Sequence, residues 1–125
     1  MRGAWFMGAL MLLAATGAVA QDPVKVDAKH YKVEMENSKV RVLRIHYGAH
    51  EKSVMHYHPD SVAIFLNDGH SKFTLPDGKT QDSSFKAGQV IWEAAMKHLP
   101  ENVGDEAFEL ILVELKGKTA TTTHK

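Results

Sequence analysis

Alternating apolar and polar side chains dominate the sequence from about residue 30 onward. The stretch 31–36 (YKVEME) alternates strictly, 71–75 (SKFTL) does the same, and 39–47 (KVRVLRIHY) is rich in β-branched residues. Successive side chains of a β-strand point to opposite faces, so this pattern predicts half-buried strands. The most apolar stretch is 107–116 (AFELILVELK). Its Ala, Glu and Leu would also suit a helix, but its alternation and its β-branched residues favour a central strand.

Turn-forming residues separate these stretches at short intervals. Asn67-Asp68-Gly69 is typical of a turn that closes a hairpin, and Pro76–Lys79 (PDGK) predicts a second turn. We expect an arm or edge strand over 22–29 and a compact bend through 94–102. Many short strands between Gly, Pro and Asp turns predict an all-β sandwich or barrel.

The first twenty residues have the three-part pattern of a secretory signal peptide. Arg2 is followed by an apolar run, and Ala18-Val19-Ala20 offers the small residues that precede a cleavage site. A membrane anchor is the alternative, since 4–20 is near the shortest spanning length. The A-x-A site favours cleavage, which would place the mature protein in the periplasm or outside the cell, free of the membrane.

The remaining chain, 21–125, has the length of one domain. It carries 14 basic and 15 acidic side chains and no basic cluster, so nothing in its charge favours nucleic acid or anionic lipid. It contains no cysteine, which excludes disulfides, thiolate catalysis and thiolate metal sites. An exported domain of this size must then rely on apolar packing, aided by a metal or by oligomerisation.

Candidate chemistry centres on His56-Tyr57-His58. Residues two apart on a strand share a face, so both imidazoles can point to one ion. A third candidate, His98, follows forty residues later. Three neutral imidazoles suit Fe, Zn, Ni or Cu and, less well, Mn, and they leave coordination positions open. The alternative is that all three are polar residues at the mouth of a metal-free barrel.

These residues form a pattern that resembles the two motifs of the cupin superfamily, over roughly 40–116. The matching positions are Gly48, His56, His58, Gly69, Gly88, His98 and Asn102. The resemblance implies a small single-domain cupin: an antiparallel double-stranded β-helix, or jelly-roll barrel, with metal ligands inside. It assigns the metal to His56, His58 and His98. The glutamate of the first motif would fall at Val62 or Ala63, and neither can bind a metal.

Other residues near the motifs are weaker candidates. Asp60 could replace the missing glutamate or cap the bend after Pro59, and Asn102 could bond a ligand or only the backbone of its bend. His50 could reach the barrel mouth as a proton relay, whereas His30 is expected at the surface. Five apolar residues are candidates for the walls of a pocket: Met55, Phe65, Phe73, Trp92 and Met96.

Two functional hypotheses follow for the cupin-like segment. One is a metal-dependent oxygenase or related enzyme on a small molecule, and the other is a non-catalytic barrel that binds a metal or small ligand. A purely structural barrel is a third. No catalytic residue can be named. The domain plan is a signal peptide (1–20), an arm and edge strand (21–38), the cupin barrel (39–116) and a flexible tail (117–125). An exposed edge strand needs protection, so a homodimer paired through 31–36 is expected.

Overall fold

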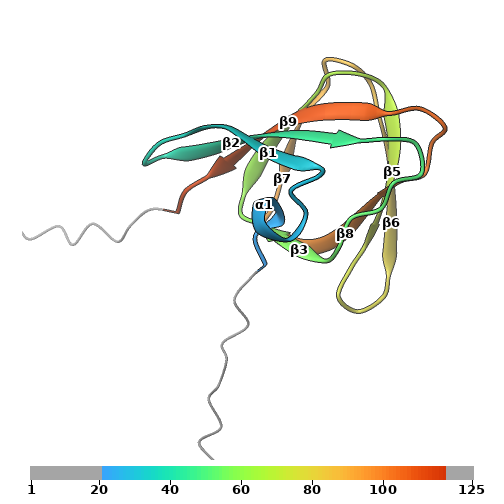
Figure 1. Cartoon of the computed structure of the whole chain (residues 1–125), viewed down its shortest axis with the longest axis horizontal. Helices are drawn as coiled ribbons and strands as arrows, with labels where there is room; N and C mark the ends of the chain where they lie inside the picture. The colour runs from blue at the N-terminus through green and yellow to red at the C-terminus, as the bar shows by residue number, and fades with distance from the viewer. Residues whose placement is uncertain (1–20, 118–125) are drawn as a thin grey trace, which may run out of the picture.

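Two antiparallel sheets face each other and enclose the core of the protein (Figure 1). The structure, a computed structural model, describes residues 21–117. The predicted signal peptide and most of the predicted tail therefore lie outside the described residues. In space the first sheet runs β1 (Tyr31–Glu36), β2 (Val40–Tyr47), β9 (Phe108–Leu115), β4 (Ser61–Phe65) and β7 (Val90–Glu93). The second runs β3 (His56–His58), β8 (Met96–Asn102), β5 (Gly69–Thr74) and β6 (Thr80–Phe85).

The predicted central strand and edge strand are both confirmed. β9 lies between β2 and β4, and every second residue from Phe108 to Glu114 is buried. β1 is at the edge of the same sheet and pairs with β2 alone. Because alternate residues of β9 point inward, its apolar side chains supply the middle of the core.

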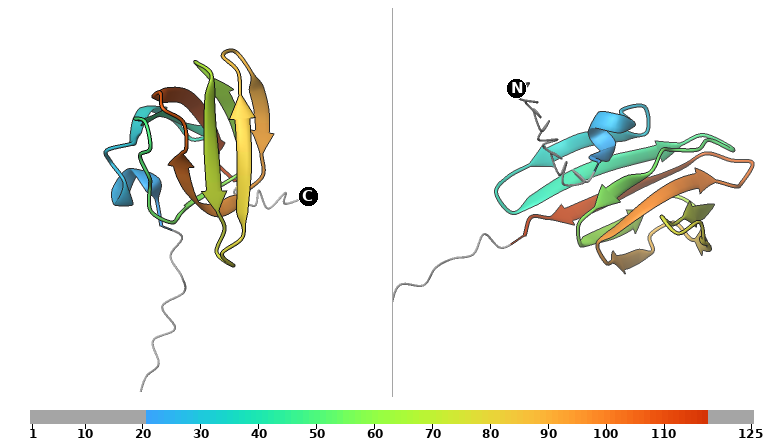
Figure 2. Two further views of the ribbon diagram at one scale, coloured as in Figure 1. Left: turned by 90° about the vertical axis from the view of Figure 1, so that its right-hand side faces the viewer. Right: turned by 90° about the horizontal axis from the view of Figure 1, so that it is seen from below.

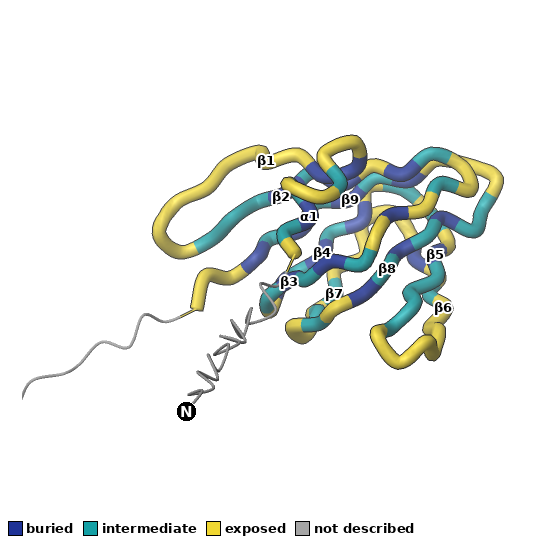
Figure 3. The backbone as a smooth tube through the Cα atoms, turned by 60° about the horizontal axis from the view of Figure 1, so that its bottom comes forward, coloured by how far each residue is buried: buried dark blue, intermediate teal, exposed yellow. Residues whose placement is uncertain are grey.

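The core lies between the two sheets. Figure 2 shows how the sheets face each other, and Figure 3 shows buried positions on strands of both. Each large apolar side chain buried there contributes roughly 1.5–3 kcal/mol relative to an exposed one. Aromatic rings cross from sheet to sheet: Phe65 of the first stacks on Phe85 of the second, with ring centroids 4.0 Å apart. The buried apolar residues are Tyr31, Leu43, Ile45, Tyr47, Ala63, Phe65, Phe85, Phe108, Leu110 and Leu112.

The turn at Asn67–Gly69 does not close a hairpin, so that prediction was wrong. β4 and β5, which it joins, belong to different sheets. Asn67 fixes the crossover to β9: its side-chain amide donates to the carbonyl of Ala107 at 2.8 Å, and its oxygen accepts from the N–H of Glu109 at 2.7 Å. The turn at Pro76–Lys79 does close the β5–β6 hairpin, with Gly78 at a φ of 85°.

Two further segments differ from the predictions. The compact bend expected over 94–102 is mainly strand β8, which pairs with β3 and β5. Its inward positions are His98, Pro100 and Asn102, so no apolar alternation marks it. The arm over 22–29 contains a helical turn, α1 (Pro23–Val26), which begins where the side chain of Asp22 accepts the N–H of Val24. No helix within residues 21–117 has the length and apolarity that a membrane crossing requires.

Candidate metal centre

Three histidines from two neighbouring strands converge inside the barrel. His56 of β3 lies directly opposite His98 of β8 in the antiparallel register, and His58 lies two residues further along β3 on the same face. Side chains directly opposite each other have Cβ atoms about 5 Å apart, which brings the rings together. All three residues are buried, and one ring nitrogen from each lies within 4.8 Å of the others.

The hydrogen bonds of the first two histidines fix where their protons are. Nδ1 of His56 is 2.8 Å from the carbonyl oxygen of Val54, which can only accept, so this nitrogen donates. Nδ1 of His58 donates to the carboxylate of Glu114 at 2.7 Å. In the neutral tautomers both Nε2 atoms therefore carry lone pairs, yet they lie 3.1 Å apart. Two lone pairs at that distance need a proton or a cation between them.

The third histidine has both ring nitrogens buried without a hydrogen-bond partner. Among the buried side-chain nitrogen and oxygen atoms of the described residues, those without a hydrogen-bond partner are Nδ1 and Nε2 of His98. An unsatisfied buried polar group costs about 1–3 kcal/mol. Burial, with smaller contributions from the neighbouring imidazoles, lowers the pKa of His98 to about 2 and that of His56 to about 4. Neither His98 nor His56 therefore takes up a proton near neutral pH, whereas a cation would bind the free nitrogens of both.

A chain of charged groups holds His58 in place. One carboxylate oxygen of Glu114 accepts a hydrogen bond from His58, and the other accepts one from Nε of Arg41 at 2.6 Å. Arg41 also donates to Asp22 at the start of α1. Although burial acts to raise the pKa of Glu114, its bonds to His58 and Arg41 lower it overall. Glu114 thus remains a carboxylate that orients the imidazole and increases its basicity.

A second polar group supports His56. Oγ of Ser53 lies 3.3 Å from Nδ1 of His56 and donates to Asp27 at 2.5 Å. Asp27 also binds Nδ1 of His30, whose Nε2 faces Glu51 at 2.5 Å. The prediction of a surface position for His30 was wrong, because its ring is buried between these two carboxylates and stacks on Tyr47.

A small cavity of about 60 Å³ extends from His58 and His98 into the barrel. By this measure a water needs at least about 10–15 Å³, so the cavity has room for a few waters or a small ligand. Its lining is mainly aromatic and aliphatic and comes from both sheets. Besides the two histidines, residues that line it include Tyr31, Tyr47, Phe65, Phe73, Phe85, Glu93, Met96, Phe108, Leu110 and Leu112.

Comparison of the structure with solved structures gives matches to cupins. A cupin domain from Bordetella pertussis superposes with a TM-score of 0.64 at 21% sequence identity, covering 70% of this chain and 92% of that one. A cupin-family protein of the RmlC-like type from Methanocaldococcus jannaschii superposes with a TM-score of 0.53 at 22% sequence identity. The match covers 71% of this chain and 83% of that one. This chain adopts the cupin fold. No protein-family model and no curated protein matches the sequence.

A third match is an uncharacterised protein with a double-stranded β-helix domain from Klebsiella pneumoniae. It gives a TM-score of 0.56 at 21% identity, covering 70% of this chain and 76% of that one. Identities at this level show that the fold is shared and leave the chemistry to be argued from the side chains of this cupin barrel.

The polar residues predicted beside the histidines lie elsewhere in the cupin barrel. Asp60 is exposed and its carboxylate accepts the N–H of Ala95, so it caps a bend rather than facing an ion. Asn102 is buried, but its amide group donates to the carbonyls of Gly48 and Glu106 and so holds loops together. His50 is not at the barrel mouth: it is exposed on a loop and pairs with Asp105 at 2.8 Å.

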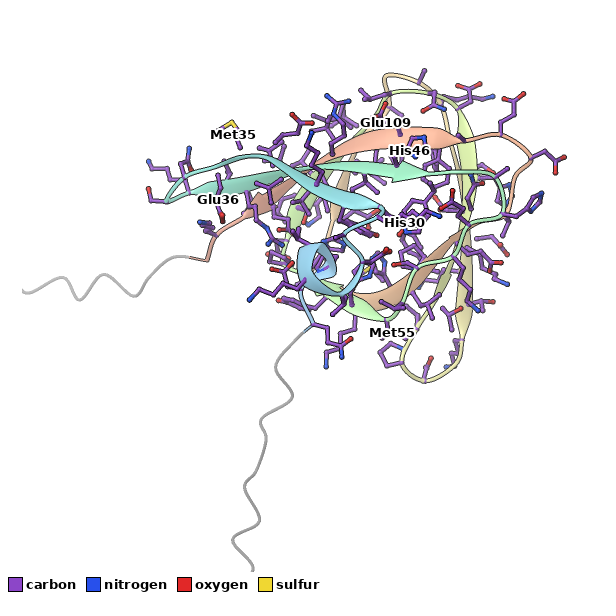
Figure 4. All side chains as sticks on the ribbon, in the orientation of Figure 1. His30, Met35, Glu36, His46, Met55 and Glu109 are labelled. Atoms are coloured by element: carbon purple, nitrogen blue, oxygen red, sulfur yellow. The ribbon has the colours of Figure 1, made fainter. Side chains whose placement is uncertain are left out.

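Three of the five residues predicted to line a pocket do line the cavity, and two do not. Phe65, Phe73 and Met96 line the cavity. Trp92 and Met55 do not, because Trp92 is on the outer face of β7 with 58% of its surface exposed, and Met55 precedes β3 at the rim (Figure 4). The neighbour of Trp92, Glu93, points inward instead and lines the cavity. Burial raises the pKa of Glu93, with an opposing effect from His58.

Sequence reasoning missed Glu114 and Arg41 as supports of the site. The signal was present, because Glu114 is in phase with Phe108, Leu110 and Leu112, and a charged side chain among inward apolar positions calls for a partner inside the barrel.

The three histidines fit a divalent transition metal. They offer two lone pairs that already face each other and a third ring without any partner. Neutral imidazole is a common ligand for Zn, Cu, Fe and Ni. Each of the first two rings has its other nitrogen fixed by a carbonyl or a carboxylate, as metal-binding histidines usually do.

Proposed function

We propose that this protein is an exported cupin that binds a divalent transition metal through His56, His58 and His98 and uses it on a small molecule. The observation that carries the proposal is that the unprotonated Nε2 atoms of His56 and His58 lie 3.1 Å apart. Beside them His98 has no hydrogen-bond partner for either ring nitrogen. Export rests on the signal-peptide pattern of residues 1–20.

The activity that we favour is that of a metal-dependent oxygenase. A bound metal with open coordination positions would bind oxygen or polarise a substrate oxygen. The chain's own residues would prepare the site for this chemistry. Glu114 orients His58, the apolar walls of the cavity limit access of water, and Glu93 is a carboxyl group at the cavity whose pKa is raised by burial.

The substrate class follows from the cavity. At about 60 Å³ between mainly apolar walls, it admits a molecule of few heavy atoms whose body is apolar. Polar side chains at the cavity that can orient it include Glu93 and three serines, Ser61, Ser71 and Ser83. Metal binding without catalysis is the second candidate function, favoured by the small size of the same cavity.

Metal analysis of protein purified without a histidine tag tests metal binding. We expect a stoichiometric transition metal in the wild type and its loss in His98→Ala. The matched control, His46→Ala, removes an exposed histidine of β2 and should retain the metal. Equal metal content in the two variants, or none in the wild type, would refute the site.

Oxygen uptake with small thiols and diketones separates the two candidate functions. An oxygenase consumes oxygen with one of these substrates and loses that activity in His56→Ala. A protein that holds the metal yet consumes no oxygen with any of them is a binding protein.

A further inference from the structure

One carboxyl group faces the cavity without a partner of its own. Glu93 of β7 is half-buried and lines the cavity, and within residues 21–117 its side chain has no hydrogen bond or ion pair. Glu114, by contrast, is paired with both His58 and Arg41. A partly buried charge without a counter-charge is costly. Glu93 is therefore a position at which the positive group of a ligand would be stabilised.

The cavity approaches the surface beside this carboxyl group. Most residues that line the cavity are buried, but Ala94 is exposed, and the half-buried ones are Phe73, Ser83, Glu93 and Met96. These residues mark the side of the cavity that is nearest to solvent, and Glu93 directly precedes Ala94 in the chain. A molecule that enters from this side therefore meets the carboxylate. No lysine or arginine is among the described residues that line the cavity, so nothing there competes for Glu93.

Glu93 lies near the histidines without belonging to their cluster. It pairs with Ser61 across β7 and β4, three residues after His58, and the charge of a protonated His58 acts on the Glu93 carboxyl group. Within the described residues, however, the group of side chains close enough to share an ion consists of the three histidines. The carboxylate is thus free to contact a molecule that the metal also holds.

We propose that the cavity takes a short aliphatic amine whose other end binds the metal, and that Glu93 anchors its ammonium group. This inference rests on the proposed metal site and names the class of molecule that the site would take. An ammonium group has three donors and forms strong hydrogen bonds with a carboxylate. The aliphatic middle of the molecule would lie against apolar wall residues such as Phe73 and Met96. An uncharged molecule of the same length would leave Glu93 unpaired, so charge selects the ligand in addition to size.

A matched pair of small acids tests the anchor. β-Alanine and butyrate have the same number of non-hydrogen atoms and a carboxylate that can bind a metal, but β-alanine ends in an ammonium group where butyrate ends in a methyl group. Each is titrated into the Co²⁺-loaded full chain, in whichever processed form mass spectrometry finds, and the visible absorption of Co²⁺ reports binding. We expect the wild type to bind β-alanine at least about tenfold more tightly than butyrate, the effect of one charged hydrogen bond.

Two variants separate direct contact from a general effect of charge. Glu93→Gln should remove the preference by weakening β-alanine binding at least about tenfold, with little change for butyrate. The matched control is Asp60→Asn, which removes a carboxylate from the same bend. Asp60 accepts the N–H of Ala95 and does not line the cavity, so this variant should keep the preference. Circular dichroism confirms that both variants fold.

Equal affinity of the wild type for the two acids, binding of neither, or a preference that survives in Glu93→Gln overturns the proposal. So does loss of Co²⁺ from Glu93→Gln, because Glu93 would then be a metal ligand and not an anchor for the amine. A wild type that takes up no Co²⁺ refutes the metal site and this inference with it. That failure is distinguished from the others by the missing cobalt absorption.

Discussion

At the scale of single residues, the site depends on where protons are held. The carbonyl of Val54 and the carboxylate of Glu114 each accept a hydrogen bond from Nδ1 of one histidine. The two Nε2 atoms, which face each other, are therefore unprotonated. The carbonyl of Val54 is neutral, whereas Glu114 carries a charge that Arg41 balances. The charge on Glu114 is therefore the feature that a conservative substitution can remove without changing the shape of the barrel.

Glu114→Gln should weaken metal binding by about 10–100-fold, the usual effect of losing a carboxylate behind a ligating histidine. The amide can still accept a hydrogen bond from His58 but no longer raises its basicity. Competition titration with a chromophoric chelator measures the affinity. Glu109→Gln, on the outward side of the same strand and paired with Arg44, is the control and should bind metal like the wild type.

Acid should destabilise the metal-free protein from about pH 6.5 downward. The folded-state pKa of His56 is about 4 and that of His98 about 2, against 6.5 for an unperturbed histidine. Below pH 6.5 the unfolded chain binds protons that the folded chain excludes, so stability present at neutral pH is lost toward pH 4, by about 3 kcal/mol for His56 alone. Urea unfolding in chelator at pH 7 and pH 4.5 measures the loss, and equal stabilities at the two values would contradict it.

The residues of the site differ in how well the sequence reveals them. The spacing of His56 and His58 on one strand face predicts their convergence directly. The partners of their other nitrogens come from Glu114, 56 positions after His58, and from a backbone carbonyl, which has no sequence signature. His30 could not be placed, since its burial depends on two carboxylates from different loops.

At the scale of elements, strands whose inward positions are apolar were predicted well, and β8 was not. β9 shows clear alternation, whereas β8 turns histidine, proline and asparagine inward. β1 forms where its alternation predicts a strand, but the predicted half-burial is wrong, because only Tyr31 is buried in this edge strand. The crossover after β4 was read as a hairpin turn because its residues suit either connection. Which strands it joins is decided by contacts far away in the sequence, such as those of Asn67 with β9.

Gly69→Ala should destabilise the protein by roughly 1–3 kcal/mol, because it overpacks the core at the crossover. A Cβ at Gly69 would lie 2.4 Å from the ring of Phe85 and 3.0 Å from Cβ of Phe108. Gly117→Ala, where a Cβ meets nothing within 4 Å, is the control and should change stability by less than about 0.5 kcal/mol. Urea unfolding of both variants decides, and an unchanged midpoint for Gly69→Ala would show that the rings can move.

At the scale of the whole molecule, a five-stranded and a four-stranded sheet share one interior. The described residues place the histidines at the barrel end that α1 borders (Figure 1). The sequence predicted the barrel and the histidine cluster through its resemblance to cupins. It did not predict that Met35, Val42, Val113, Val62 and Trp92 form one row across the larger sheet, because that row exists only once five separate segments are in register.

Export predicts a shortened chain. When the full sequence is expressed in a Gram-negative host, the protein should appear in the periplasmic fraction with Gln21 as its first residue, because Ala18 and Ala20 provide the cleavage site. Intact-mass spectrometry of the fraction gives the N-terminus. Ala20→Arg should block processing and retain the longer form, whereas a wild type recovered uncut in the cytoplasm would disprove export.

The crossover after β4 has one more consequence. The carbonyl of Phe65 accepts from Gly88, the N–H of Leu66 donates to Glu109, and Asn67 is tied on both sides to β9. These bonds hold the start of the crossover against the five-stranded sheet, so the corner at which the chain passes from one wall of the barrel to the other is fixed. The barrel should therefore sort molecules by steric fit, and its range of guests would be widened by shortening Phe73 or Met96 at the wall rather than by loosening the frame.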